Sequence, residues 1–200
     1  MKIRSPHVPH RKRQEICHDA LHVTFRLSAG LPSLRQDAEF ECITESIEEA
    51  QERFGCRIIE FSVMSNHIHL VVEAPDKESL ARAMKGLKVR IVRALNKLWK
   101  RTGSIFSDRY YASAMKTVRH ASNALRYVLN NGRRHYAWMR QNVPDKYSSG
   151  PWYRHWKERN GQPFRTDRCP VVPPRSRVLQ EAMKLAIGVN EVPGPFIEAA

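Results

Sequence analysis

Apolar and polar positions follow two different periods along this chain. Apolar runs and alternating stretches predict β-strands at residues 21–28, 57–64, 67–74 and 109–116. Apolar residues spaced three and four apart predict helices at residues 37–54, 79–99, 117–131 and 176–187, with Gly132 as the stop of the third one. Only Ser65 and Asn66 separate the second strand from the third, so these two strands form an antiparallel hairpin.

The order of these elements predicts an α+β fold. The succession β-α-β-β-α-β-α with a central hairpin is typical of a ferredoxin-like domain, in which an antiparallel sheet carries helices on one face. The other face is then left for a ligand. We expect this domain to span residues 17–135. A basic flexible arm at residues 1–16 precedes it, and a C-terminal extension at residues 136–200 that contacts DNA or is partly disordered follows it.

The charge of the chain points to a polyanionic partner. There are 34 Lys and Arg residues against 20 Asp and Glu residues, which gives a formal net charge of +14. Nucleic acid is the commonest partner of such a chain, and an anionic membrane surface is the weaker alternative. Cations neutralise phosphates and aromatic side chains stack on unpaired bases. The candidate DNA contacts are Arg11, Lys12, Arg13, Lys85, Lys88, Arg93, Phe106, Arg109, Arg133, Arg134 and Trp152.

The sequence disfavours membrane and secreted classes. No apolar run approaches the roughly 18 residues of a membrane-spanning helix. The basic start of the chain lacks the apolar core of a secretory signal. The 4 cysteines show no C-x-x-C spacing, which is typical of reduced cysteines in a cytosolic protein. Cys17, His18 and His22 lie close together, but with no second cluster of ligands we expect no metal site there.

Two histidines stand inside the predicted strand at residues 67–74. Side chains at positions i and i+2 of a strand share a face, so His67 and His69 project together while Ile68 faces the helices. Two adjacent imidazoles have the spacing that a divalent metal needs, whereas a single one would more often be a packing residue. Two nitrogen donors do not complete a site. We therefore expect an oxygen donor from another element, and a phosphate oxygen from the substrate.

The helix predicted at residues 117–131 carries a tyrosine away from its apolar stripe. Tyr127 lies nearly opposite the centre of that stripe, and Asn131 shares its face. If this helix crosses the sheet, Tyr127 and Asn131 both reach a metal at His67 and His69. Asn131 is then the oxygen ligand and Tyr127 the nucleophile, because a nearby cation favours the phenolate. A rim tyrosine without function is the alternative.

Several motifs together resemble those of a known family. The stretch VMSNHIHLVVEAP is similar to the His-hydrophobic-His signature of HUH single-tyrosine transposases. GSIFSDRYYAS and ALRYVLNNGRRH resemble segments of the REP-associated tyrosine transposases within that group. The resemblance covers residues 20–135 and includes the order of the elements. Each motif alone is weak, and the combination is specific.

The resemblance implies an enzyme that nicks single-stranded DNA beside a short hairpin. It uses Mg²⁺ or Mn²⁺, links a tyrosine to the 5′ phosphate and leaves a free 3′-hydroxyl. His67 and His69 correspond to the metal histidines of the family, Tyr127 to its nucleophile and Asn131 to its polar residue one turn later. The family commonly has proline after that residue, whereas this chain has Gly132. The contribution of Asn131 therefore stays open, and Asn130 is the alternative ligand.

Further expectations and alternatives accompany this interpretation. The resemblance implies a bacterial, cytoplasmic and nucleoid-associated protein that binds repetitive palindromic DNA as a monomer or homodimer. Tyr110 and Tyr111 are alternative nucleophiles, although beside Arg109 in a strand they are more typical of packing or stacking residues. A non-catalytic hairpin-binding protein is the second functional hypothesis. A ferredoxin-like RNA-binding module is the third, and it lacks the expected aromatic residues on the central strands.

Overall fold

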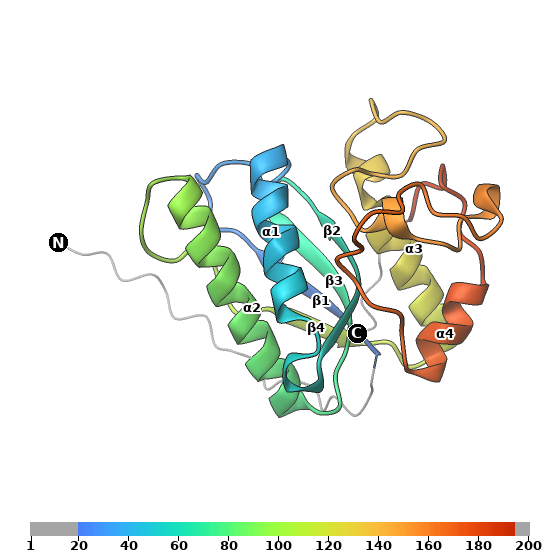
Figure 1. Cartoon of the computed structure of the whole chain (residues 1–200), viewed down its shortest axis with the longest axis horizontal. Coiled ribbons are helices and arrows are strands. Elements are labelled where there is room, and N and C mark those ends of the chain that lie inside the picture. The colour runs from blue at the N-terminus through green and yellow to red at the C-terminus, as the bar shows by residue number, and fades with distance from the viewer. Residues whose placement is uncertain (1–19, 195–200) are drawn as a thin grey trace.

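The computed structural model of this chain describes residues 20–194 and shows helices on both sides of a central sheet (Figure 1). Its strands are β1 (Ala20–Arg26), β2 (Arg57–Val63), β3 (His67–Glu73) and β4 (Tyr111–Ala114). Its α-helices are α1 (Asp37–Ala50), α2 (Lys77–Leu98), α3 (Val118–His135) and α4 (Arg177–Lys184). Short 3₁₀ turns lie at Arg53–Gly55, Gly150–Trp152 and Lys157–Arg159. The predicted order of elements is confirmed, whereas the predicted basic arm lies outside the described residues.

The sheet has the ferredoxin-like strand order β2-β3-β1-β4, and every pair is antiparallel. The hairpin predicted around Ser65 and Asn66 joins β2 to β3 and is closed by a hydrogen bond from the Met64 N–H to the His67 carbonyl, at 2.8 Å. In the neighbouring pair, Thr24 of β1 lies opposite His69 of β3. The predicted α+β, ferredoxin-like class is therefore confirmed.

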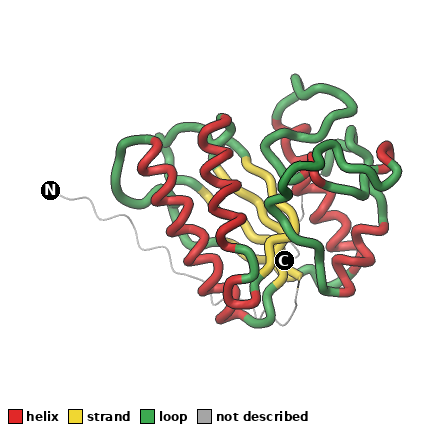
Figure 2. Tube along the Cα trace, in the orientation of Figure 1, coloured by secondary structure: helices red, strands yellow, loops and turns green. Residues whose placement is uncertain are grey.

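The two faces of the sheet carry different helices (Figure 2). One face is apolar through residues such as Phe25, Ile68 and Leu70, and it packs under α1 and α2. On the opposite face, Ile59 and Val71 pack with α3 and α4. The prediction placed the helices on one face only. This holds for α1 and α2, but α3 and α4 cover part of the other face because their apolar stripes also need burial.

Some predicted boundaries shift for local reasons. The first helix ends at Ala50 and not at residue 54, because Glu52 and Phe54 adopt positive φ angles of 58° and 57°. The second helix begins at Lys77, where the side chain of Asp76 accepts a hydrogen bond from the Ser79 N–H at 2.7 Å. Thr117 caps α3 in the same way, by accepting a hydrogen bond from the His120 N–H. The last strand shortens to Tyr111–Ala114.

Gly132 is not a helix stop, so that prediction is wrong. The helix α3 continues through Gly132 to His135. A Cβ atom at position 132 would lie 2.2 Å from Oδ2 of Asp145 and 2.9 Å from Sδ of Met139, so only glycine allows this approach. The carboxylate of Asp145 is in turn bound by the Arg35 guanidinium, with N–O distances of 2.6 and 2.9 Å. Gly132 therefore serves the packing of the C-terminal extension.

The C-terminal extension is an integral part of the packed structure up to residue 194. The Val63 N–H of β2 donates to the Tyr147 carbonyl at 2.8 Å, and the Ser149 N–H donates to the Phe61 carbonyl at 2.9 Å. Leu179 of α4 is fully buried against α3. Between residues 20 and 194, no helix combines the length and hydropathy that a bilayer span demands.

Candidate active site

A polar cavity of about 530 Å³ lies on the face of the sheet that α3 partly covers. Strands β1 and β3, helix α3 and the segment before β4 all contribute to it. We call it the histidine cavity. Its lining residues are His22, Thr24, Arg26, His67, His69, Ser107, Asp108, Arg109, Tyr111 and Tyr127. The structure thus brings three predicted site residues, His67, His69 and Tyr127, into one cavity.

The strand register places the imidazoles side by side. His67 and His69 alternate with the buried Ile68 along β3, and their ring centroids are 4.6 Å apart. His22 of the neighbouring strand β1 stacks on His69, with a centroid distance of 5.1 Å. Three histidines from two strands therefore form one cluster.

Hydrogen bonds hold both β3 histidines by the same ring nitrogen. Nδ1 of His67 donates to Oδ1 of Asn66 at 2.7 Å. Nδ1 of His69 lies 3.2 Å from Oγ1 of Thr24 and 3.1 Å from Nε2 of His22. Such contacts fix the orientation of an imidazole and direct its other nitrogen to a metal. For His69 that nitrogen, Nε2, is buried and has no hydrogen-bond partner among the residues that the structure describes.

Burial keeps these histidines neutral. It lowers the pKa of His67 and of His22 to about 4, and the pKa of His69 lies well below its ordinary value for the same reason. Neighbouring histidines add to the effect on His22 and His69. Neutral imidazole is the form that binds metals, so the cluster presents ligands at neutral pH without first losing protons.

Tyr127 reaches the cluster because it lies away from the buried stripe of α3. Leu125, Val128 and Leu129 are buried in the core beneath α3, whereas Tyr127 is half-buried and lines the histidine cavity. Its ring centroid lies 5.2 Å from that of His69 and 6.1 Å from that of His22, both in edge contacts. Its phenol therefore opens into the same space as the imidazoles.

The two asparagines that follow on α3 have different environments. Asn130 is buried, and its amide nitrogen donates to the Gly188 carbonyl at 3.0 Å, so its side chain is tied to the C-terminal extension. Asn131 is 0% exposed, and neither its side-chain oxygen nor its nitrogen has a hydrogen-bond partner among residues 20–194. Asn131 is not among the residues that line the histidine cavity. The side-chain oxygens of both asparagines are buried without a hydrogen-bond partner among the described residues, so burial alone does not decide between Asn131 and Asn130 as the oxygen donor.

These donors fit a divalent metal ion. The described residues contain no group of three or more His, Cys, Asp and Glu side chains arranged to hold a metal. Instead the histidine cavity offers two neutral imidazoles with Nδ1 engaged, while the buried amide oxygens of Asn130 and Asn131 on α3 lack a partner within residues 20–194 but do not line the cavity. Neutral imidazole nitrogens and amide oxygens are ligands of divalent metal ions, so the chemistry of these side chains is compatible with such an ion.

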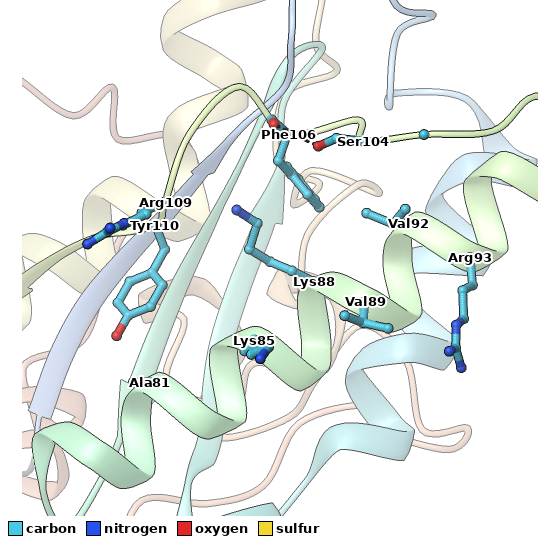
Figure 3. Close-up of a pocket in the computed structure, with 11 residues that line it drawn as sticks. Ala81, Lys85, Lys88, Val89, Val92, Arg93, Ser104, Phe106, Arg109 and Tyr110 are labelled. Atoms are coloured by element: carbon cyan, nitrogen blue, oxygen red, sulfur yellow. Dashed lines mark hydrogen bonds between the residues drawn. The ribbon is translucent and has the colours of Figure 1, made fainter. Parts of the chain in front are cut away.

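The predicted DNA contacts fall into different environments. Lys85, Lys88, Arg93, Phe106 and Arg109 line a second cavity beside α2, together with Val89, and we call it the α2 cavity (Figure 3). Arg109 lines the histidine cavity as well.

Among residues 20–194, the other predicted contacts line neither cavity. Arg134 is exposed at the end of α3. Arg133 is buried, and its guanidinium donates to the carbonyls of Arg140 and Val143, which gives it a structural role. The indole of Trp152 donates to Asp167 at 3.1 Å. Arg11, Lys12 and Arg13 lie outside the described residues.

The two alternative nucleophiles separate at the start of β4. Tyr111 lines the histidine cavity and is 45% exposed, whereas Tyr110 lines the α2 cavity and packs on Phe25 with a centroid distance of 6.5 Å. Tyr111 therefore remains a competitor of Tyr127, and Tyr110 does not share the space with the histidines.

Sequence reasoning considered His22 only beside Cys17 and His18 and set it aside, and it missed Thr24. Their residue types alternate with apolar ones along β1, which places them on one face of the sheet. Only the pairing of β1 with β3, in which Thr24 lies opposite His69, brings them to the cluster. A search for polar residues on every second position of the first strand would have raised them as candidates.

Comparisons with known proteins identify the family of this chain. A ferredoxin-like α+β fold with a histidine pair and a tyrosine in one cavity is what the resemblance to single-tyrosine transposases implies. The family model described as "Transposase IS200 like" matches residues 20–131, which is more than half of the chain. The chain belongs to this family of transposases.

Solved structures agree at the level of the fold. The structure of a REP-associated tyrosine transposase bound to a REP hairpin superposes with a TM-score of 0.62 at 15% sequence identity, and covers 84% of this chain and 100% of that one. The structure of a presumed transposase from Deinococcus radiodurans covers 56% of this chain and 91% of its own at 14% identity. Its TM-score is 0.43, which is too low to establish a common fold. We found no significant match among curated proteins.

Proposed function

We propose that this transposase is a single-strand DNA endonuclease and strand transferase that uses Tyr127 as its nucleophile. The observation that carries the proposal is the histidine cavity, in which Tyr127 of α3 lies against His69 of β3. A rim tyrosine without function would not be expected to share a cavity with three neutral histidines. The membership in the IS200-like family supports the same reaction class.

The reaction balances with a phenol as the attacking group. The Tyr127 oxygen forms a bond to phosphorus while the bond from phosphorus to O3′ breaks. The phenol proton is released and O3′ takes up a proton, so the products are a 5′-phosphotyrosine and a free 3′-hydroxyl. Attack by another 3′-hydroxyl reverses the step and joins two strands. The covalent bond conserves the energy that rejoining requires.

His67 and His69, with Asn131, are the residues that would hold the divalent ion. When bound, Mg²⁺ or Mn²⁺ polarises a phosphate oxygen and offsets the negative charge of the transition state. Asn66, Thr24 and His22 contribute by orienting the two imidazoles. Arg26 and Arg109 at the wall of the cavity attract and position the phosphate backbone.

The proposed substrate is single-stranded DNA next to a short hairpin. The REP-associated transposase of similar fold was solved with a REP hairpin, which makes repetitive palindromic DNA the first substrate to test here. One copy of the chain suffices for the proposed site, because its own Tyr127 lies against its own His69. We therefore propose that a monomer is competent for cleavage.

The decisive experiment is a denaturing-gel assay for a covalent protein–DNA adduct. Oligonucleotides that carry the palindromic repeats flanking this gene would be incubated with the purified protein and Mn²⁺, and in parallel with EDTA. We expect an adduct that requires Mn²⁺ and disappears in Tyr127→Phe. Tyr111→Phe is the matched control, since it removes the other phenol of the histidine cavity.

Each outcome has a clear meaning. An adduct that survives in Tyr127→Phe and disappears in Tyr111→Phe would transfer the nucleophile to Tyr111. Tight hairpin binding without any adduct, on oligonucleotides that span the full repeat and its flanks, would contradict the enzymatic proposal and favour a hairpin-binding protein.

A further inference from the structure

The α2 cavity has the size of a ligand site but no part in the proposed chemistry. It encloses about 550 Å³ between α2 and the segment that leads into β4. Ligand sites in proteins typically measure about 300–1,000 Å³. In Figure 3 the side chains of Phe106 and Tyr110 point from this segment toward α2, and Lys88 extends from α2 toward them.

The inner surface of the α2 cavity is apolar and aromatic. Val89 is 42% exposed there, whereas Leu87 and Ile91 of the same helix are fully buried. Phe106 forms part of the floor of the cavity; it is only 6% exposed, and the edge contact with Phe25 holds its ring at a centroid distance of 5.5 Å. Aromatic and aliphatic surfaces of this kind receive flat apolar groups such as nucleobases.

The rim of the α2 cavity is positively charged. Lys85 and Arg93 are exposed on α2, and Arg109 lies across from them on the segment before β4. The Lys88 ammonium lies 4.9 Å from the centroid of the Phe106 ring and donates to the Asp108 carbonyl at 2.6 Å. None of the lining residues in the described part of the chain is acidic. The ligand that suits this cavity is therefore flat in one part and anionic in another.

The α2 cavity borders the histidine cavity. Arg109 lines both, and the neighbouring residues Tyr110 and Tyr111 line one cavity each. Asp108, whose carbonyl accepts from Lys88, also lines the histidine cavity. A DNA strand that passes Arg109 therefore has one part in each cavity.

We propose that the α2 cavity binds one unpaired nucleotide of the substrate strand, with the base on the exposed surface of Val89 above the floor that Phe106 forms, and the phosphate on the basic rim. This inference rests on the proposed function, because it takes single-stranded DNA as the substrate. It goes further by assigning a separate binding site for a nucleotide that does not react. The cavity thereby anchors the strand while a neighbouring phosphate reaches Tyr127.

Other occupants fit the charges less well. A second copy of this chain carries a net charge of +14, and a basic rim repels it. A purely apolar small molecule leaves Lys85, Arg93 and Arg109 without a counter-charge. An unpaired nucleotide satisfies both the apolar surface and the cations.

The test compares two single-stranded probes that differ only in their bases. One is a fluorescent thymidylate dodecamer, and the other is an abasic strand of the same length and charge. Stacking does not depend strongly on base identity, so any single strand reports on the site, and we expect wild type to bind the thymidylate probe about tenfold more tightly. Val89→Asp should abolish this preference by placing a carboxylate on the exposed apolar surface of the α2 cavity. Leu98→Asp is the matched control, because Leu98 lies on the same helix at 39% exposure but does not line the cavity.

The proposal is overturned if wild type binds both probes equally, or if Val89→Asp keeps the preference for bases. It is also overturned if Leu98→Asp loses the preference as completely as Val89→Asp. Equal circular dichroism spectra and melting temperatures verify that the variants fold. Neither probe needs to be cleaved. A failed adduct assay therefore argues against the proposed chemistry alone, whereas equal binding of the probes argues against the nucleotide site alone.

Discussion

The histidine cavity and the α2 cavity have similar volumes, about 530 and about 550 Å³, but opposite characters. The histidine cavity is lined by imidazoles and phenols that can take part in bond making. The α2 cavity presents valines, Phe106 and Tyr110 surrounded by cations, and it contains none of the histidines to which the chemistry is assigned. The segment at Arg109 belongs to both, so the division of labour between chemistry and binding occurs over a few residues.

This comparison predicts two kinds of variants. Changes in the histidine cavity should slow cleavage and leave the affinity for DNA nearly unchanged. Changes in the α2 cavity should weaken binding and leave the bound complex able to react. A residue shared by both should change both quantities.

Among variants that keep the Tyr127 nucleophile, the largest effect is expected from His67→Ala. Loss of one of two imidazole ligands should reduce the single-turnover rate of adduct formation by about 10³-fold, which corresponds to about 4 kcal/mol of transition-state stabilisation. The dissociation constant for a hairpin oligonucleotide, measured by fluorescence anisotropy, should stay within about threefold, because cations rather than histidines dominate DNA binding. His120→Ala, at a half-buried position of α3 outside the cavity, is the control. Equal losses of the adduct-formation rate in His67→Ala and His120→Ala would show that the effect is not specific to the proposed metal ligand.

A smaller effect is expected from Thr24→Val. The substitution keeps the shape of the side chain and removes the hydroxyl that lies 3.2 Å from Nδ1 of His69. Loss of such a supporting contact typically lowers metal affinity by about 10–100-fold. The Mn²⁺ concentration that gives half-maximal cleavage should therefore rise, and saturating Mn²⁺ should restore most of the rate. Thr44→Val on α1 should leave the Mn²⁺ requirement unchanged.

Arg109→Ala should affect both cavities at once. We expect DNA affinity to fall about tenfold, since an arginine that binds a phosphate makes a charge-assisted hydrogen bond. The cleavage rate of the bound complex should also fall, because Arg109 lines the histidine cavity. Single-turnover kinetics at saturating protein separates the two quantities. A loss of affinity with an unchanged cleavage rate of the bound complex would show that Arg109 has no role in the proposed active site. An exposed arginine that only contacts the DNA backbone, such as Arg119, would give that result.

The smallest effect is expected from Lys85→Ala, at the rim of the α2 cavity. A plot of the logarithm of the binding constant against the logarithm of the salt concentration should become shallower by about 0.7, the value for one phosphate contact on a single strand. The cleavage rate at saturating protein should not change. Lys116→Ala, exposed outside both cavities, should leave the slope as it is in the wild type.

Local sequence patterns were sufficient for the hairpin and its histidines. The alternation of His67, Ile68 and His69 places the two imidazoles on one face regardless of the rest of the fold. The position of Tyr127 outside the stripe of α3 is likewise a property of a single helix. These two patterns brought together His67, His69 and Tyr127, which do share the histidine cavity, but they also placed Asn131 there, and it is not among the lining residues. The catalytic roles of these residues stay predictions.

Features that depend on long-range pairing could not be predicted. The contact of Thr24 with His69 requires the register between β1 and β3, which no local pattern contains. Gly132 was misinterpreted for the same reason, since glycine at the end of an amphipathic pattern usually ends a helix. The carboxylate that requires a glycine there belongs to Asp145, in the extension after the helix. The α2 cavity combines residues of a helix and of a distant loop, so the sequence indicated its cations but not the space between them.

The backbone hydrogen bonds between β2 and residues 147–149 affect how readily the incompletely folded chain aggregates. An outer strand with unpaired N–H and C=O groups is a template on which other chains can add strands and aggregate. Here the Val63 N–H and the Phe61 carbonyl are occupied by Tyr147 and Ser149. Before the ribosome has released that extension, or after a protease has removed it, the backbone N–H and C=O groups at the outer edge of β2 are unpaired and can bind another chain. By pairing with the edge of β2, the C-terminal extension thus protects the preceding domain from self-association.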